Sequence, residues 1–376
     1  MKIIIPKKRL EMAVKNICRV INKKNALPIL DSILCMVDEP KKRLTLTGSD
    51  CEVWLHCQVD LDECEGSGGF CIDAKLMKKA LAELKDQPLT IEIDKTIEKM
   101  ELKHQTGTTQ LPLHDHSEYP TPTWHDDTTT EWTLEASMLN RVMKRSVMFV
   151  ADDELRPIMC GVLFDQTKEA LNIVASDGHM LVRNAEKVNN PTGSFIMPKK
   201  VARLLPKTLT GSDDIKAEFG ERLASFEQGP VSLVFRIIEG TYPKYMKVIP
   251  ENPPHHMTAD RLSMLAAIRN VANFTTEKSR QVKMHIGNDN TMTLYGEDFD
   301  ISAAANDRID IDYPEAHPMS IGVKADNTIK ILSLIAELRI HINFIDPSRA
   351  LTFTPDEPIY EGEELTMLIM PMLLSE

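Results

Sequence analysis

Three of four consecutive residues near the middle of the chain carry side chains that could do chemistry. Ser176, Asp177 and His179 surround Gly178, and serine, aspartate and histidine are the components of a hydrolase triad. Adjacent residues of one strand or turn point in different directions, whereas triad members must converge within hydrogen-bond reach. We therefore interpret this segment as a tight turn and expect no catalytic residue, with a hydrolase as the alternative.

The cysteines are the second candidate for chemistry. Cys57, Cys64 and Cys71 recur every seven residues among seven cysteines in all. Zinc sites usually begin with a closer pair, such as C-x2-C. Walker and dinucleotide glycine patterns, which would indicate a nucleotide, are lacking. We expect free thiols in a reducing compartment, no metal and no cofactor.

A repeat of domain size organises the chain around the turn of Asp177. Residues 44–52 (LTLTGSDCE), 171–179 (LNIVASDGH) and 292–300 (MTLYGEDFD) share a pattern in which an apolar strand reaches an acidic residue. These acidic residues, Asp50, Asp177 and Asp298, lie 127 and 121 residues apart. A helix-like segment precedes each pattern, and a second helix and further strands follow it. The sequence thus predicts an α+β fold of three similar domains, each with two helices backed by antiparallel sheets.

Proline and polar residues mark the linkers between these domains. They gather at residues 119–130 (YPTPTWHDDTTT) and 250–258 (PENPPHHMT), where regular structure cannot continue easily. We predict domains at 1–128, 129–253 and 254–376. The expected helices are 7–21, 74–85, 137–146, 198–205, 259–280 and 326–339, and the clearest expected strands are 2–5, 89–95, 215–219 and 340–345.

Targeting and membrane signals are weak. The first nine residues carry a short apolar run before Pro6, which is less than the core of a signal peptide. The apolar stretches of the chain fall short of the ~20 residues of a membrane span. We expect a cytoplasmic protein with no membrane partner.

Positive charge is concentrated on the expected helices. The chain carries a net charge of −12, but windows around the six helices total +19, which leaves about −31 for the rest. Lysine also favours exposed helices without any function, yet residues 7–24 hold seven basic side chains against Glu11 alone. A basic surface on an acidic protein can hold the phosphates of double-stranded DNA without reading sequence. On charge alone the candidates are Arg141, Lys144, Arg145, Lys199, Lys200 and Arg203.

Five motifs in order give the chain a family resemblance. They are residues 27–30 (LPIL), 47–52 (TGSDCE), 176–181 (SDGHML), 239–250 (EGTYPKYMKVIP) and 370–374 (MPMLL). Over essentially its whole length the sequence resembles the beta subunit of bacterial DNA polymerase III, the sliding-clamp family. The resemblance implies three clamp domains, with helices inside and sheets outside, that close head to tail into a homodimeric ring.

The implied function is that of a non-catalytic processivity factor. Such a ring encircles duplex DNA and tethers the replicative polymerase. The resemblance also implies that the clamp loader and other repair and replication proteins bind it through short clamp-binding peptides. A repeat-built interaction scaffold that never meets DNA is the alternative.

The family's peptide groove lies between the second and third domains. A methionine-rich tail is too apolar to extend into water, and methionine adapts to varied ligands, although the same tail could complete the core of the third domain. Family members often have a basic residue where Met180 and Leu373 stand, and Ser375 and Glu376 extend the usual end. By resemblance the groove residues are Met159, Ser176, Gly178, His179, Met180, Leu181, Pro243, Lys247, Val248, Leu368, Ile369, Met370, Pro371, Met372, Leu373 and Leu374.

The resemblance also implies DNA contacts and a dimer seam. The DNA contacts are Lys24, Lys75 and the loop with Asp153, Arg156, Pro157 and Ile158, where some relatives carry aromatic residues. The seam joins residues 103–111, from Lys103 to Leu111, to a third-domain surface with Phe274, Glu297, Asp298 and Asp300.

Overall fold

The computed structural model of the chain describes residues 1–22, 24–25, 27–94, 98–123, 129–153, 155–315, 317–358 and 360–374. The expected domain boundary at residue 128 and the terminal Ser375 and Glu376 lie outside these residues. The chain forms two compact units. One contains Met1–Met143 and Lys200–Ile237, and the other contains Lys144–Lys199 and Ile238–Glu376.

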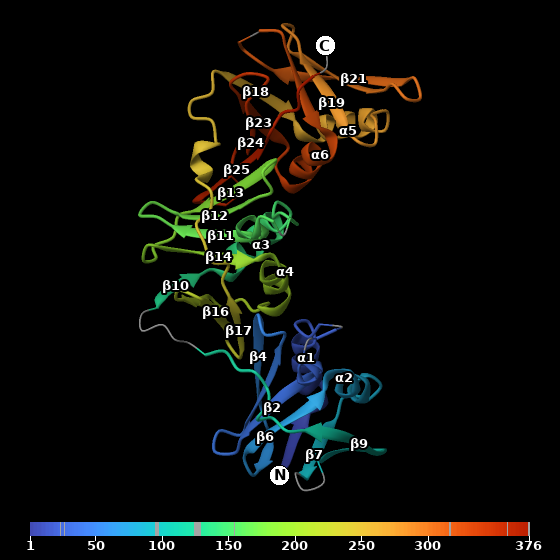
Figure 1. Cartoon of the computed structure of the whole chain (residues 1–376), viewed down its shortest axis with the longest axis vertical. Coiled ribbons are helices and arrows are strands. Elements are labelled where there is room, and N and C mark those ends of the chain that lie inside the picture. Colours follow the sequence, from blue (N-terminus) through green and yellow to red (C-terminus); the bar gives the residue numbers. More distant parts are fainter. Residues whose placement is uncertain are drawn as a thin grey trace. The chain divides into compact units, whose positions relative to one another are not determined.

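An antiparallel sheet, whose strand order differs from the order in the sequence, runs through the first unit (Figure 1). Helices α1 and α2 pack against each other. Helix α1 (Lys7–Ile17) buries Leu10, Val14 and Ile17, which recur at helical spacing. Helix α2 (Ala74–Ala82) begins where the Asp73 carboxylate accepts a hydrogen bond from the Leu76 amide. In sheet order the strands are β10 (Thr130–Leu134), β15 (Ile215–Phe219), β16 (Leu223–Gln228), β17 (Val231–Arg236), β4 (Val53–Asp60), β3 (Arg43–Ser49), β2 (Ser32–Asp38), β6 (Gly68–Asp73), β9 (Gly107–His114), β8 (Lys99–His104), β7 (Pro88–Asp94), β1 (Lys2–Pro6) and β5 (Glu63–Glu65).

The second unit repeats this plan with helices α5 and α6 in contact (Figure 1). Helix α5 (Arg261–Ala272) is capped by Asp260, and helix α6 (Ala325–Leu334) buries Ile331 and Leu332. Helices α3 (Ala136–Ser146) and α4 (Lys199–Thr208) complete the set among the described residues. In sheet order the strands are β14 (Gly193–Pro198), β11 (Gly161–Gln166), β12 (Leu171–Ser176), β13 (Met180–Glu186), β25 (Glu363–Ile369), β24 (Leu351–Pro355), β23 (Arg339–Phe344), β18 (His255–Asp260), β21 (Ala303–Asp312), β20 (Thr291–Asp298), β19 (Gln281–Ile286) and β22 (Met319–Lys324).

The threefold pattern of the sequence corresponds to one turn built three times. The carboxylate of Asp50 accepts hydrogen bonds from the amides of the second and third residues after it, and Asp177 does the same. Asp298 accepts from the amide of Asp300. Aspartate favours turns because its side chain can bond its own following backbone. The repeat therefore marks equivalent hairpins, β3–β4, β12–β13 and β20–β21.

The glycine two residues before Asp50 and Asp298 has a packing role. A Cβ on Gly48 would collide with Ile17 of α1, and a Cβ on Gly296 would collide with the Val271 carbonyl of α5. The first helix of each outer domain therefore approaches its sheet closely at this position.

Strand pairing carries each sheet from one repeat into the next. Strand β17, the last of the central repeat, pairs with β4, the fourth strand of the first repeat. Strand β25, the last of the third repeat, pairs with β13, the fourth strand of the central repeat. The central repeat thus contributes strands to both compact units, which explains why the units do not coincide with the three repeats.

The expected elements agree with the structure in type and differ at helix ends. The expected strand 215–219 is β15. The expected helix 259–280 was too long, because α5 ends at Ala272 and Thr275 turns its hydroxyl back to the Ala272 carbonyl. The helices expected at 7–21 and 326–339 end at Ile17 and Leu334. None of the helices in the described ranges combines the length and apolar character needed to cross a bilayer.

Candidate partner groove, nucleic-acid surface and subunit edges

The segment that resembled a catalytic triad is a closed turn. The Ser176 hydroxyl donates to the Met180 carbonyl at 2.7 Å and accepts from the Gly178 amide at 3.1 Å. The Asp177 carboxylate accepts from the amides of His179 and Met180 at 2.8 and 2.7 Å. Gly178 has φ +90°, a conformation that suits glycine. The hydroxyl and the carboxylate therefore hold the turn, and the geometry supports no nucleophile–base pair.

This turn forms one wall of an apolar groove of about 220 Å³. The other walls come from the 3-10 turn Pro157–Cys160, the segment after β17, and the end of β25. Leu181 and Leu368 are almost fully buried at its floor, whereas Val248 and Met370 are exposed at its rim. Of the residues expected from the resemblance, ten line it: Met159, Ser176, Gly178, His179, Met180, Leu181, Pro243, Val248, Leu368 and Met370.

The tail was only partly placed by the sequence. Ile369 is 1% exposed and belongs to the core, and Lys247, Pro371, Met372, Leu373 and Leu374 do not line the cavity. The Met372 amide donates to the Gly322 carbonyl at 2.8 Å, and Gln281 donates to the Leu373 carbonyl at 2.8 Å. These bonds hold the tail along β22 and β19, and the expected role of the residues after Met370 in the groove stays a prediction.

Three lining residues were missed by the sequence reasoning, namely Tyr242, Lys244 and Tyr245. The Tyr245 hydroxyl donates to the Asp165 carboxylate at 2.9 Å, which fixes the ring in the wall. Burial raises the pKa of both Tyr242 and Tyr245, so both stay neutral. Two tyrosines in a linker marked by proline were the available signal, because aromatic side chains in a linker need a partner surface.

Arg156 lies at the rim of this groove. Its Nη1 is 4.0 Å from the Met159 sulfur, and a Cβ on Gly178 would come within 2.9 Å of it. Its Nε donates to Asp153 at 2.8 Å, and this guanidinium lowers the pKa of Asp153. The loop with Asp153, Pro157 and Ile158 therefore presents an ion pair near the groove, and its expected contact with DNA stays a prediction.

The basic side chains expected at DNA fall into two classes. Lys24, Lys75, Lys144 and Arg203 are exposed, and Arg141 is half-buried. Arg145 is buried and pairs with Glu363 at 2.7 Å, so its assignment as a DNA contact was wrong.

Two further lysines of the expected surface are engaged within the protein. The Lys199 ammonium donates to the Val150 carbonyl at 2.9 Å and to Asp152 at 2.6 Å. Lys200 pairs with Asp50 and donates to Asn22 at 3.1 Å, which ties α4 to the first hairpin turn. These lysines hold the structure around the basic face instead of presenting free charge.

Besides the strands that end each sheet, β9 and β21 have an edge that the described strands leave largely uncovered. In β9, residues 107–112 pair with β8 on one side only, since β6 reaches only Leu113 and His114. In β21, residues 303–310 pair with β20 on one side only, since β18 reaches only Ile311 and Asp312. Strand β9 is the last strand of the first repeat and β21 is the fourth strand of the third.

The seam residues expected from the resemblance lie at or beside these edges. Leu111 is in β9, and Glu297 and Asp298 end β20. Lys103 lies one strand inward, where it pairs with Glu92 at 2.7 Å. Phe274, Phe299 and Ile301 are exposed apolar side chains in the third repeat.

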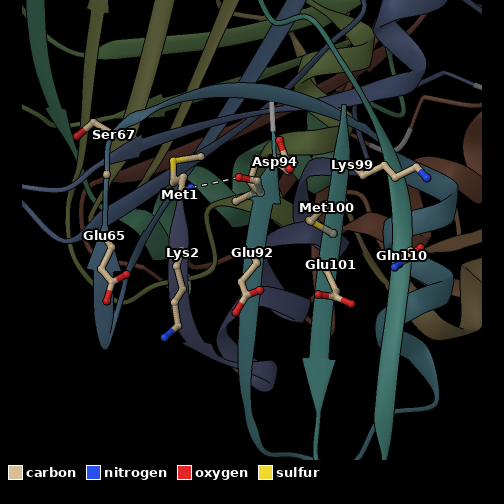
Figure 2. Close-up of a pocket in the computed structure, with 12 residues that line it drawn as sticks. Met1, Lys2, Glu65, Ser67, Glu92, Asp94, Lys99, Met100, Glu101 and Gln110 are labelled. Carbon is tan, nitrogen blue, oxygen red and sulfur yellow. Dashed lines mark hydrogen bonds between the residues drawn. The ribbon is translucent and has the colours of Figure 1, made fainter. Parts of the chain in front are cut away.

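A wide hollow of about 920 Å³ lies on one face of the sheet, beside the β9 edge (Figure 2). Glu65, Lys2, Glu92, Glu101 and Gln110 form a row across five strands, each opposite the next in register. The row is polar, with four charged side chains, and each member is at least partly exposed, which contrasts with the apolar groove. It lacks the apolar walls that bind a peptide side chain.

The described cysteines and histidines form no metal site. Within the described ranges, no three histidine, cysteine or acidic side chains come together as ligands would. Burial raises the pKa of Cys57 to about 11 and that of Cys71 to about 12, so both are protonated thiols at neutral pH.

Comparison with known proteins decides the family. Family models of the DNA polymerase III beta subunit match the chain in three consecutive parts: the N-terminal domain at residues 1–123, the central domain at 133–244 and the C-terminal domain at 246–373. Together these parts span nearly the whole sequence. The chain belongs to the DNA polymerase III beta-subunit family.

Relatives of this beta-subunit family agree in sequence and in fold. The Beta sliding clamp of Pseudomonas aeruginosa is 23% identical over 361 residues, which cover 94% of this chain and 95% of the relative. That of Escherichia coli K12 is 24% identical over 339 residues, covering 89% and 90%. The crystal structure of the P. aeruginosa DNA polymerase sliding clamp with ligand matches with a TM-score of 0.92 at 20% identity and covers both chains fully. At this identity the structural match shows a shared fold of three clamp domains.

Proposed function

We propose that the chain is a sliding clamp, a non-catalytic ring of two copies that encircles duplex DNA and tethers the replicative polymerase. Membership of the beta-subunit family supports this role, as do relatives named Beta sliding clamp. The observation that carries the proposal is a repeated junction, in which the last strand of one repeat pairs with the fourth strand of the preceding repeat. It occurs twice within the chain, and among the described strands it leaves one last strand, β9, and one fourth strand, β21, paired along one side only over residues 107–112 and 303–310.

A second copy can supply the missing partners. Edge strands with unpaired amides and carbonyls are templates for pairing with another chain, and two equivalent head-to-tail contacts close a ring. The third junction would therefore pair β9 of one copy with β21 of the other, twice in the dimer. We propose domains 1–128, 129–253 and 254–376 as the six units of the ring.

The register of this third junction follows from the first. Val234, the fourth residue of β17, lies opposite Trp54 in β4. The fourth residue of β9 is Gln110, and its hairpin with β8 closes as that of β16 with β17 does. Trp54 precedes Leu55, which pairs with Gly48, and Ala304 precedes Ala305, which pairs with Gly296. Trp54 and Ala304 therefore occupy equivalent positions in their repeats. Gln110 should therefore lie opposite Ala304 of the second copy.

The small residues of β21 favour such pairing. Residues 303–305 are all alanine and are at least partly exposed, so they permit a close approach of two backbones. The half-buried Asp298 and the exposed Asp300 precede them, and Phe299 and Ile301 are 79% and 71% exposed. Exposed apolar side chains of this size commonly mark protein contacts. We propose Leu111, Phe274, Glu297, Asp298 and Asp300 as part of the seam, with Lys103 behind it.

Exposed basic residues would hold the DNA. Phosphate contacts of this kind position the protein and carry no sequence information, which suits a ring that slides. We propose Lys24, Lys75, Lys144 and Arg203 as contacts, with Arg141 beside them.

The apolar groove would bind clamp-binding peptides of the polymerase, the clamp loader and other repair and replication proteins. Grooves that orient a peptide combine apolar walls with a few polar groups, and here Met159, Met370 and Tyr245 line the groove together with Lys244. Methionine side chains adapt to different ligands, which suits several partners. We place this activity in the cytoplasm.

A dimer test addresses the seam. Replacing Gln110→Pro in β9 removes an amide that points away from β8 toward the open edge, and should convert the dimer to monomer in sedimentation experiments at micromolar concentration. Glu65→Pro is the matched control. It lies in the edge strand β5, which is not part of the proposed junction between copies, so the protein should stay a dimer. Monomeric wild-type protein would contradict the ring.

A peptide titration addresses the groove. Val248→Ala removes an exposed apolar side chain at the rim, and Met246→Ala removes one that is equally exposed nearby but does not line the cavity. With a labelled clamp-binding peptide from a replicative polymerase, only Val248→Ala should weaken binding, by roughly 1 kcal/mol. Equal affinities for both variants would count against the groove.

A further inference from the structure

The junction of β4 and β17 contains a second pocket, of about 270 Å³, which the clamp role does not use. Trp54 and Leu223 form its buried part, and Thr121, Pro122 and Thr123 form one side. Arg222 and Arg236, both exposed, complete the lining. We propose that this pocket binds a peptide segment bearing a carboxylate, either an acidic side chain or a free C-terminus. The proposal rests on the clamp role, because it gives that clamp a second partner site.

Strand register makes this pocket the counterpart of the apolar groove. Trp54 pairs with Ser49 across its hairpin and with Val234 across the junction. Leu181 pairs with Ser176 and with Leu368 in the same two ways. Two residues further along the last strand, Arg236 lines one pocket and Met370 lines the other.

The linkers of the two pockets match as well. Tyr119 and Pro120 precede the lining residue Thr121, as Tyr242 and Pro243 precede Lys244. Tyr119 is buried against Leu30 and Leu34, and Tyr242 is buried against Leu163 and Leu181. The two sites therefore share one framework and are of similar volume.

The two pockets differ in the chemistry of their lining. Where the groove has Met370, this pocket has Arg236, whose Nε donates to the Cys51 carbonyl at 3.3 Å and lies 3.9 Å from Glu52. Its guanidinium carbon is 5.9 Å from the centre of the Trp54 ring. These contacts restrain the side chain, and its two terminal nitrogens have no hydrogen-bond partner within the described ranges.

Arg222 provides a second cation at the same pocket. Within the described part of the chain its guanidinium has no ion-pair partner, and the exposed Glu52 is the acidic group that contacts Arg236. Two guanidinium groups against one carboxylate leave a positive site. The planar donor fork of arginine matches a carboxylate in two parallel hydrogen bonds.

A peptide fits this pocket better than a nucleic acid does. Single-stranded nucleic acids bind by stacking bases on exposed aromatic rings, and the Trp54 ring is 3% exposed, with its Nε1 donating to the Pro120 carbonyl at 2.9 Å. The equivalent groove is the site that we propose for clamp-binding peptides, and the small volume suits one aliphatic side chain beside the carboxylate.

The indole of Trp54 provides a reporter for the test. The full chain has three tryptophans, so protein labelled with 5-fluorotryptophan gives three fluorine resonances, and Trp54→Phe assigns one of them. The probe is N-acetyl-Ala-Leu with a free carboxylate, and N-acetyl-Ala-Leu-amide is the matched control. The acid should shift the Trp54 resonance in a saturable way, and the amide should not.

Variants separate the arginines from general charge. Arg222→Ala with Arg236→Ala should weaken binding of the acid about tenfold or more, since each removes a charge-assisted hydrogen bond. Arg43→Ala, which removes a partly exposed arginine of β3 that pairs with Asp60, should leave binding unchanged. No saturable shift, or the same shift with the amide, would overturn the proposal. A response to inorganic phosphate or short duplex DNA but not to the acid would replace it with a phosphate site.

The groove titration distinguishes failure of this inference from failure of the clamp role. If the labelled clamp-binding peptide binds the groove while Trp54 stays silent, the second pocket alone is refuted. If Trp54 responds to the acid while the groove peptide does not bind, the assigned role of the groove fails.

Discussion

Replacing Arg145→Ala should destabilise the protein without acting through DNA. Arg145 and Glu363 pair at 2.7 Å, with side chains 10% and 6% exposed. Glu186, also buried, lies directly opposite Glu363 in the β13–β25 pairing. Removal of the guanidinium would leave the buried Glu363 carboxylate without this cation, and breaking one partner of a buried pair costs about 3–5 kcal/mol.

The magnitude can be followed in a thermal melt. For a unit of this size each kcal/mol lowers the melting temperature by about 2–4 °C, so the drop should be roughly 6 to 20 °C. Lys144→Ala, the exposed neighbour on the same helix, is the matched control and should stay within about 0.5 kcal/mol of wild type. Arg145→Met with Glu363→Gln should recover part of the loss, because the charge at Glu363 is removed along with that of its partner.

DNA retention supplies the refuting result. If Arg145→Ala melts like Lys144→Ala but loses DNA retention, then Arg145 reaches the DNA and the reasoning from its burial is wrong. If it melts early and the fraction still folded retains DNA, the ion pair is structural.

Three further predictions concern the DNA face, the tail and pH. Lys24→Glu with Arg203→Glu should reduce DNA retention and keep the stability within about 1 kcal/mol of wild type. Lys41→Glu with Lys99→Glu is the control and should retain DNA. Unchanged retention in the Lys24 and Arg203 variant would refute the assigned DNA contacts. Truncation after Ile369 should abolish groove binding because Met370 is lost, while the dimer stays intact and the melting temperature nearly unchanged. Removal of residues 375–376 alone should have no effect. An unfolded third domain after the longer truncation would show that the tail is core. Burial lowers the pKa of His56, so the unfolded chain takes up this proton first as pH falls through about 6.5, and stability is lost below that pH. His56→Gln should flatten the pH dependence of the melting temperature relative to wild type, while the exposed His256→Gln should not.

The sequence predicted the repeated elements because their signals are local. Alternating apolar residues defined β15, and the aspartate turns at Asp50, Asp177 and Asp298 each bond their own backbone. Residues after a hairpin or a proline-marked linker, such as Leu181 and Pro243, could be placed in the groove from the resemblance.

The remaining features depend on which way a side chain faces. Charge counts over helices treated Arg145 and Lys144 alike, yet one is buried against Glu363 and the other is exposed. The composition of the tail could not distinguish a groove wall from a strand-like contact along β22. Arg156 lies close to Gly178, and its bond to Asp153 restrains it there. Residue spacing in the sequence could not predict this contact.

A covalent closure experiment tests the ring itself. The register places Gln110 of one copy opposite Ala304 of the other, so Gln110→Cys with Ala304→Cys should form a disulfide at each seam, and wild-type protein under the same oxidation is the control. If the variant is loaded on a nicked circular plasmid and then oxidised, the account predicts a protein–DNA complex that survives denaturing detergent and disappears once the plasmid is linearised. Cross-linked dimer that leaves the circular plasmid in detergent as readily as the linear one would contradict the claim that this protein encircles DNA.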